Sequence, residues 1–138
     1  MKTTSLMIAL CAFTLAGCNT PAHLTPTHCK TGDVMTQTTL YFGLSRPHGA
    51  DISSTEWQSF VDKQVTPRFK AGLTVFAANG QWLGEDGKVA REQSKALLLI
   101  HPDTLQNEKD IEALRTGYKQ QFQQESVMRV DEPVCVAF

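Results

Sequence analysis

Residues 38–57, TTLYFGLSRPHGADISSTEW, decide the fold because they place a strand, a loop and the start of a helix in immediate succession. Within residues 38–44 the large apolar side chains alternate, so Leu40, Phe42 and Leu44 share one side of an extended chain. This alternation predicts a strand that buries one of its two faces.

The helix start follows a loop marked by Pro47 and Gly49. Residues 53–56, Ser-Ser-Thr-Glu, match a capping box, in which the serine and glutamate side chains satisfy backbone N–H groups of the first turn. Apolar side chains then recur on one helical face over residues 57–65, and Pro67 limits the helix. These residues predict an amphipathic helix.

The middle of the chain has the pattern of extended segments separated by turns. Residues 73–77 alternate, and Asn79-Gly80 is a strong signal for a two-residue turn, so we expect a hairpin with residues 81–83 returning. Asp86-Gly87 marks a further turn. Residues 95–101, KALLLIH, then form the most apolar strand after the amino-terminal region.

A second helix and a last strand complete the pattern. Asn107 is the expected helix cap, and an apolar stripe follows at Ile111, Leu114, Tyr118 and Phe122. Residues 126–138 predict a strand interrupted near Pro133, which suits an edge or a bulge.

The order strand, helix, two or more strands, helix, strand predicts an α+β fold. It fits a two-layer ferredoxin-like sandwich, a mainly antiparallel sheet with two helices on one face. The 138 residues, 41% hydrophobic and 20% charged, suit a single domain, which we place at residues 36–138. The formal net charge of -1 implies no basic face, so we expect no nucleic-acid partner.

Residues 96–100, ALLLI, are apolar at every position, which predicts that both faces of this strand are buried. A two-layer sandwich covers only one face with helices. A homodimer that packs sheet against sheet is the simplest expectation, and a folded-back tether or hairpin is the alternative.

The amino terminus has the features of an export signal. Lys2 precedes an apolar run at residues 6–15 that is too short to span a bilayer permanently. Residues 15–18, Leu-Ala-Gly-Cys, resemble the bacterial lipobox, so we expect a signal peptide at residues 1–17 and lipid on Cys18. The alternative is an ordinary secretory signal with a chance cysteine.

The residue after the lipobox indicates a location. Asn19, and not aspartate, follows the cysteine, which in Gram-negative lipoproteins implies outer-membrane sorting. We therefore expect a protein anchored to a membrane through its lipid, facing the periplasm from the outer membrane. Residues 18–35, rich in Thr and Pro, predict a flexible tether. His23, His28 and Cys29 lie there without the closed geometry of a metal site, so we predict no metal and no cofactor.

Cleavage of the signal peptide removes Cys11, and lipidation modifies Cys18, so two cysteine thiols remain. Export places them where disulfides persist, and the first and last strands of a ferredoxin-like sheet are neighbours. We therefore predict a disulfide between Cys29 and Cys135. The alternative is two free thiols, with Cys135 as a small core residue.

Several ungapped motifs carry a family resemblance: residues 40–43 LYFG, 67–69 PRF leading to 72–75 GLTV, 80–82 GQW, 91–95 REQSK and 124–129 QESVMR. Over residues 38–138 the chain resembles the bacterial domain-of-unknown-function family numbered 3574. Lys70 and Gln93 stand where the family pattern leads us to expect proline. Its members are generally described as lipoproteins, which agrees with the lipobox, and the resemblance implies no particular activity.

The sequence contains none of the common catalytic motifs after the signal region, neither HExxH nor GxSxG nor a P-loop. The polar residues of the family motifs are the candidate site: Arg68, Arg91, Glu92, Ser94, Lys95, Glu125 and Arg129. Clustered, they would bind an anion through arginine forks or use Glu92 as a base beside Lys95. The alternative is ion pairs and caps that fix loops. We expect His48 and His101 to be loop residues.

Two classes of function follow. The first is a non-catalytic envelope module that binds a small ligand or an envelope protein. The second is a small enzyme, or an anionic-ligand-binding protein, that uses a charged cleft on the sheet. A cleft that holds Arg68, Glu92 and Glu125 together would favour the second class, and an apolar patch would favour the first.

Overall fold

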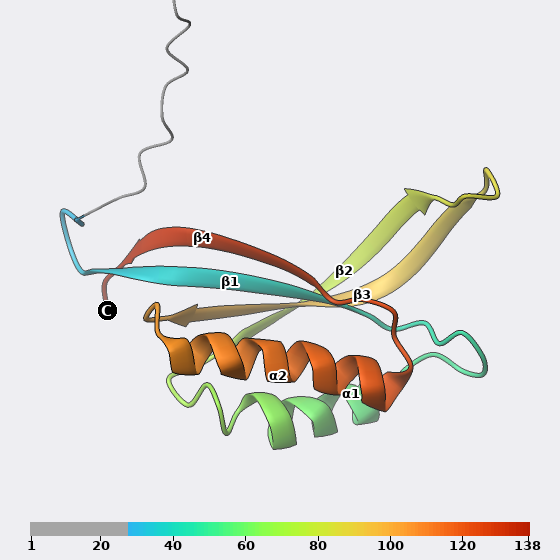
Figure 1. The fold of residues 1–138 in the computed structure, drawn as a ribbon, viewed down its shortest axis with the longest axis horizontal. Helices are drawn as coiled ribbons and strands as arrows, with labels where there is room; N and C mark the ends of the chain where they lie inside the picture. The colour runs from blue at the N-terminus through green and yellow to red at the C-terminus, as the bar shows by residue number, and fades with distance from the viewer. Residues whose placement is uncertain (1–27) are drawn as a thin grey trace, which may run out of the picture.

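The computed structural model describes residues 28–138, so the expected signal peptide, the lipidated Cys18 and most of the expected tether lie outside the described residues. The elements in chain order are β1 (Asp33–Gly43), α1 (Ser54–Phe60), the π-helical turn η1 (Val61–Val65), β2 (Thr74–Leu83), β3 (Val89–His101), α2 (Leu105–Phe122) and β4 (Met128–Val136). The strands form one layer and the helices the other (Figure 1).

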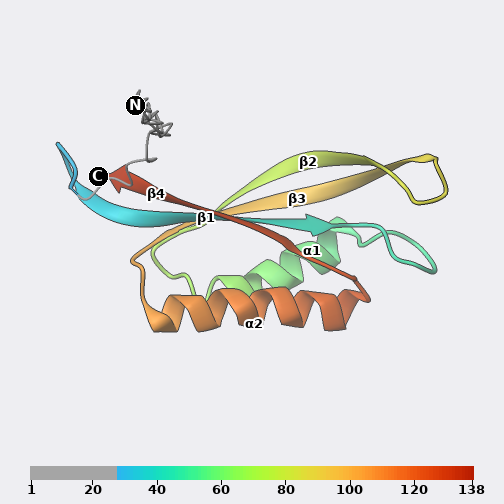
Figure 2. The ribbon, with the colours of Figure 1, turned by 45° about the horizontal axis from the view of Figure 1, so that its top comes forward.

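The sheet has the strand order β2-β3-β1-β4, and every neighbouring pair is antiparallel. Both helices lie against the same face, and no helix of residues 28–138 lies against the opposite face (Figure 2). This arrangement is a ferredoxin-like α+β sandwich, which confirms the predicted fold class.

The expected alternation in β1 directs its apolar side chains toward the helices. Leu40 and Phe42 are fully buried, and Leu40 pairs with Leu97 of β3, which faces the same way. The predicted stripe of α2 is also buried, from Ile111 to Phe122. Aromatic rings fill the centre of this layer, where Phe42 lies 4.6 Å from Tyr118 between ring centroids.

The local signals of the first helix are confirmed. Ser53 caps α1, its side chain accepts the N–H of Glu56, and the Glu56 side chain accepts the N–H of Ser53. The helix widens at its end, because the N–H of Thr66 donates to the carbonyl of Val61 at 2.9 Å. The helical segment therefore ends just before Pro67, as predicted.

The expected turn at Asn79-Gly80 is wrong. β2 continues to Leu83, with Asn79 and Gly80 opposite Gln93 and Glu92 of β3. The chain reverses at the second predicted turn, where the Asp86 side chain accepts the N–H of Lys88 and Gly87 adopts a φ of 73°. The pairing of ten residues with β3 outweighs a local turn preference, and Gly87 supplies the left-handed conformation at no steric cost.

Three further expectations are corrected. Thr104, and not Asn107, caps α2, and its hydroxyl accepts the N–H of Asn107 at 3.1 Å. β4 runs without interruption through Pro133, which is tolerated because β4 is an edge strand. His101 is not a loop residue but the buried last residue of β3, where its Nε2 is 2.9 Å from the hydroxyl of Thr38.

At the same end of the sheet, a disulfide joins Cys29 and Cys135, with 5.5 Å between their Cα atoms. The predicted bridge is therefore present. β1 begins at Asp33, so residues 33–35, expected in the tether, belong to the sheet. Over residues 28–138 no helix is long and apolar enough to cross a membrane.

Candidate functional site

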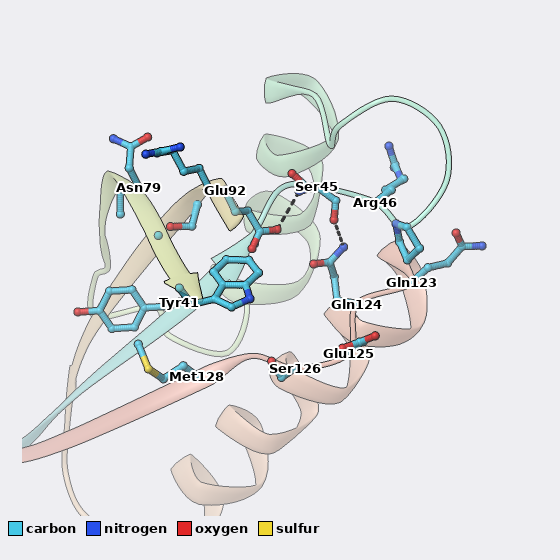
Figure 3. A pocket seen from close by; sticks show the side chains of 17 residues that line it. Tyr41, Ser45, Arg46, Asn79, Glu92, Gln123, Gln124, Glu125, Ser126 and Met128 are labelled. Atoms are coloured by element: carbon cyan, nitrogen blue, oxygen red, sulfur yellow. Dashed lines mark hydrogen bonds between the residues drawn. The ribbon is translucent and has the colours of Figure 1, made fainter. Parts of the chain in front are cut away.

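A pocket of about 740 Å³ lies where the carboxyl end of β1, the outer half of the β2–β3 hairpin and the end of α2 meet. Its walls come from four stretches of the chain, within residues 41–47, 78–82, 91–94 and 123–128, and Figure 3 shows their side chains around one space. The apolar part of the wall is formed by Tyr41, Trp82 and Met128. Trp82 is half exposed, so its ring is available to a ligand.

Two carboxylates line the pocket, those of Glu125 and Glu92. Glu92 is the one bonded to the loop after β1. Its Oε1 accepts the backbone N–H of Ser45 at 3.1 Å. Gln124 donates from its side chain to the carbonyl of Ser45 at 2.7 Å, so both backbone groups of Ser45 are held (Figure 3). The absence of a side chain at Gly43 leaves space for the Glu92 carboxylate. The loop after β1 is thus fixed by side chains from β3 and from the segment after α2.

Side chains of α2 also hold the backbone beside the pocket. The hydroxyl of Tyr118 donates to the carbonyl of Gly43 at 2.8 Å, and burial raises the pKa of this phenol above its ordinary value. The Nε and Nη2 atoms of Arg115 donate to the carbonyl of Val127 at 3.1 and 3.0 Å. These bonds hold the backbone on both sides of the pocket to α2.

Arg46 lines the pocket but is engaged with the helix layer. Its guanidinium lies 2.6 Å from the Glu56 carboxylate and stands over the Phe122 ring. The hydrogen bonds from Arg46 and Ser53 lower the pKa of Glu56 from 4.5 to about 2.

The pocket brings together four of the residues that the sequence singled out: Arg91, Glu92, Ser94 and Glu125. Lys95 does not join them. The expected pairing of Glu92 with Lys95 fails because the two residues are three apart in one strand and lie on opposite faces of the sheet. Lys95 lies opposite Phe42 and Ala77, on the helix side.

Arg68 and Arg129 also lie away from the pocket. Arg68 is 3.6 Å from Asp110 and donates to the carbonyl of Gln64, which joins the end of the first helical segment to α2. Arg129 of β4 binds the carboxylates of Glu108, Glu112 and Asp131 at 2.7 to 3.0 Å. The cleft that would combine Arg68, Glu92 and Glu125 is therefore not formed, and both arginines hold elements together.

Sequence reasoning missed the aromatic wall and the loop that Glu92 holds. Tyr41 and Trp82 lie on the open face because they alternate with buried or paired neighbours in β1 and β2. The expected turn at Asn79-Gly80 would end the strand before Trp82. In the structure β2 continues, so Trp82 lies on the same face as Phe76 and Ala78. Within residues 28–138 no group of three or more His, Cys, Asp or Glu side chains is placed to hold a metal ion.

Several solved structures share this fold. A phage SAM lyase in complex with S-methyl-5'-thioadenosine superposes with a TM-score of 0.54 at 18% identity, covering 75% of this chain and 84% of the lyase. CutA from Synechococcus elongatus, complexed with Bis-Tris, gives a TM-score of 0.50 at 10% identity, covering 78% of this chain and 87% of CutA. Identities this low show a common fold alone.

No curated protein matches the sequence. One family model does match, over residues 37–138, and this range contains every strand and helix of the sandwich except the first residues of β1. The chain therefore belongs to the family described as protein of unknown function DUF3574, as its sequence motifs predict.

Proposed function

We propose that this protein is a lipid-anchored envelope protein whose folded domain binds a small ligand in the pocket beside Glu92. The anchor rests on the apolar run at residues 6–15 and on the lipobox-like residues 15–18. Outer-membrane sorting rests on Asn19. Cys18→Ser, expressed in a Gram-negative host, is expected to move the protein from the membrane to the soluble periplasmic fraction, and a variant that stays in the membrane would contradict lipidation.

The ligand chemistry rests on one observation: the Glu92 carboxylate faces a pocket whose apolar wall contains Tyr41 and Trp82. Among the ion pairs of residues 28–138, none involves Glu92 or Glu125. A carboxylate beside aromatic rings suits a ligand with a cationic or hydrogen-bond-donating group and a planar or apolar body.

A non-catalytic role is supported better than catalysis or anion binding. The catalytic interpretation depended on Arg68 meeting Glu92 and Glu125, and Arg68 instead contacts Asp110. Anion binding needs free guanidinium forks, whereas Arg46, Arg68 and Arg129 all face carboxylates. Arg91, the remaining arginine of the pocket, donates to the side chain of Gln81.

Nucleosides are the ligand class that we propose to test first. The phage lyase of similar fold was solved with S-methyl-5'-thioadenosine, a nucleoside. A nucleoside has a planar base that would stack on Trp82 or Tyr41, and ribose hydroxyls that would donate to Glu92. The shared fold suggests this class of probe and does not extend the lyase activity to this chain.

Isothermal titration calorimetry of the Cys18→Ser protein with S-methyl-5'-thioadenosine, adenosine and a quaternary ammonium compound tests the proposal. Quenching of Trp82 fluorescence gives a second readout, because the other tryptophan, Trp57, is buried. Glu92→Gln keeps the shape and an acceptor for Ser45 and removes the charge, and is expected to weaken a cationic ligand at least about tenfold. Glu85→Gln at the exposed hairpin tip is the matched control. Equal affinity in both variants would contradict a role for Glu92.

A further inference from the structure

The two edges of the sheet differ in chemistry. β4 carries Arg129, Asp131, Glu132 and Pro133, which are the residue types that discourage an edge strand from pairing with another chain. β2, at the other edge, reads TVFAANGQWL and has neither a charged residue nor a proline in its ten positions. A strand of this length and composition presents unpaired backbone N–H and C=O groups to any strand that approaches it.

The face of the sheet without helices is apolar beside that edge. Phe76 lies opposite Ala96, and Thr74 opposite Leu98. In β3 these positions alternate with Leu97 and Leu99, which are buried under the helices, so all four residues lie on the face away from the helices. Exposed side chains on this face are Phe76 at 52%, Trp82 at 51%, Met128 at 57% and Val130 at 41%. Exposed apolar side chains gathered on one face of a sheet mark an interaction surface.

We infer that a second copy of this chain pairs along β2, so that the two sheets join edge to edge into one. An identical strand related by a two-fold axis runs antiparallel to β2 and matches its backbone groups, and the partner face is equally uncharged around Phe76. Ten residues paired in this way give a line of contact of ~30 Å along the edge.

The dimer also changes the pocket. Ala78, Asn79, Gly80 and Trp82 belong both to the pocket wall and to the β2 edge. A strand paired along β2 would therefore stand beside the pocket, and the partner copy would contribute to the wall on that side. This inference does not depend on the identity of the ligand, because it rests on the edge and the face.

Sedimentation velocity of the Cys18→Ser protein at tens of micromolar tests the inference. The wild-type surface is expected to give a dimer. Phe76→Lys places a charge on the interface and is expected to raise the dissociation constant of the dimer at least about tenfold. Leu105→Lys changes a residue that is 82% exposed on α2, away from this face, and is the control that should remain dimeric.

A second variant and two contrary results complete the test of the dimer. Thr74→Lys, on the same face and edge, serves if Phe76→Lys does not fold by circular dichroism. A monomer with the wild-type surface, or a dimer that both lysine variants leave intact, would overturn the inference. Binding of the monomer to vesicles of outer-membrane lipid, lost in Phe76→Lys, would show that this surface contacts a membrane and not a second copy.

Discussion

The Glu92 carboxylate occupies the space that a side chain on Gly43 would need. An ideal β-carbon at Gly43 would lie 2.7 Å from Cδ and 2.8 Å from Oε2 of Glu92, closer than such atoms approach in proteins. A side chain at this position would therefore displace the Glu92 carboxylate, while the backbone itself does not call for glycine, since Gly43 is not among the residues with positive φ.

Gly43→Ala is expected to push the Glu92 carboxylate away from Ser45 and to lower the free energy of unfolding by about 1 kcal/mol, through loss of the hydrogen bond between them. Gly117→Ala is the control, because no atom lies within 4 Å of its added β-carbon and alanine favours the helix by up to about 1 kcal/mol. Urea unfolding of both variants measures the difference. Equal stability of the two would show that Glu92 moves aside at no cost.

The Arg46–Glu56 pair predicts a loss of stability in acid. The pKa of Glu56 is about 2 in the folded protein and 4.5 as an ordinary value, so the unfolded chain binds a proton first. The stabilisation is complete above about pH 4.5 and is lost as the pH falls toward 2. Arg46→Gln should raise the pKa of Glu56 and flatten this dependence, as followed by NMR titration and by unfolding between pH 2 and 6. Lys88→Gln, in an exposed pair with Asp86, should leave the profile unchanged.

Arg129→Gln is expected to cost about 1–3 kcal/mol, because it leaves the carboxylates of Glu108, Glu112 and Asp131 without their shared partner. The pKa of Glu108, lowered by its hydrogen bond from Arg129, should rise toward its ordinary value. Arg91→Gln is a matched change at a more exposed arginine that bonds only a neutral side chain, and it should shift stability by less than about 0.5 kcal/mol. A larger loss for Arg91→Gln would reverse the roles assigned to the two arginines.

Replacing both Cys29 and Cys135 with serine is expected to lower the free energy of unfolding by about 2–4 kcal/mol, the usual contribution of a native disulfide. Reductant should affect the unfolding of the protein with native cysteines at these positions and not that of the double variant. Peptide mass spectrometry without reductant should recover the linked pair. Recovery of two alkylated thiols from periplasmically expressed protein would contradict the bridge.

Much of the fold follows from the sequence because its signals are local or periodic. The alternation around Leu40, the stripe of α2 and the capping box at Ser53 each predict an element that the structure contains. The turn at Asn79-Gly80 was wrong because register with β3 is a property of the whole sheet, and a dipeptide does not report it.

The candidate site was predicted only in part for a similar reason. Arg91, Glu92, Ser94 and Glu125 meet in one pocket. Arg68 and Arg129 belong to equally strong family motifs, but they bind carboxylates elsewhere. A motif indicates that a side chain has a specific role, and only its position in three dimensions distinguishes a ligand contact from a tie between elements. The aromatic wall at Tyr41 and Trp82 depends on the correct register of two strands, so it could not be assembled before the sheet was known.

The bond between Cys29 and Cys135 determines how the domain responds to mechanical load. Tension that enters the chain ahead of Cys29 passes directly to β4 through the covalent bridge. A motor or protease that pulls on the chain from outside the bridge would therefore not extend the residues between the two cysteines, because residues 29–135 form a closed covalent loop. The folded domain is shielded from forced extension along its own backbone until the bridge is reduced.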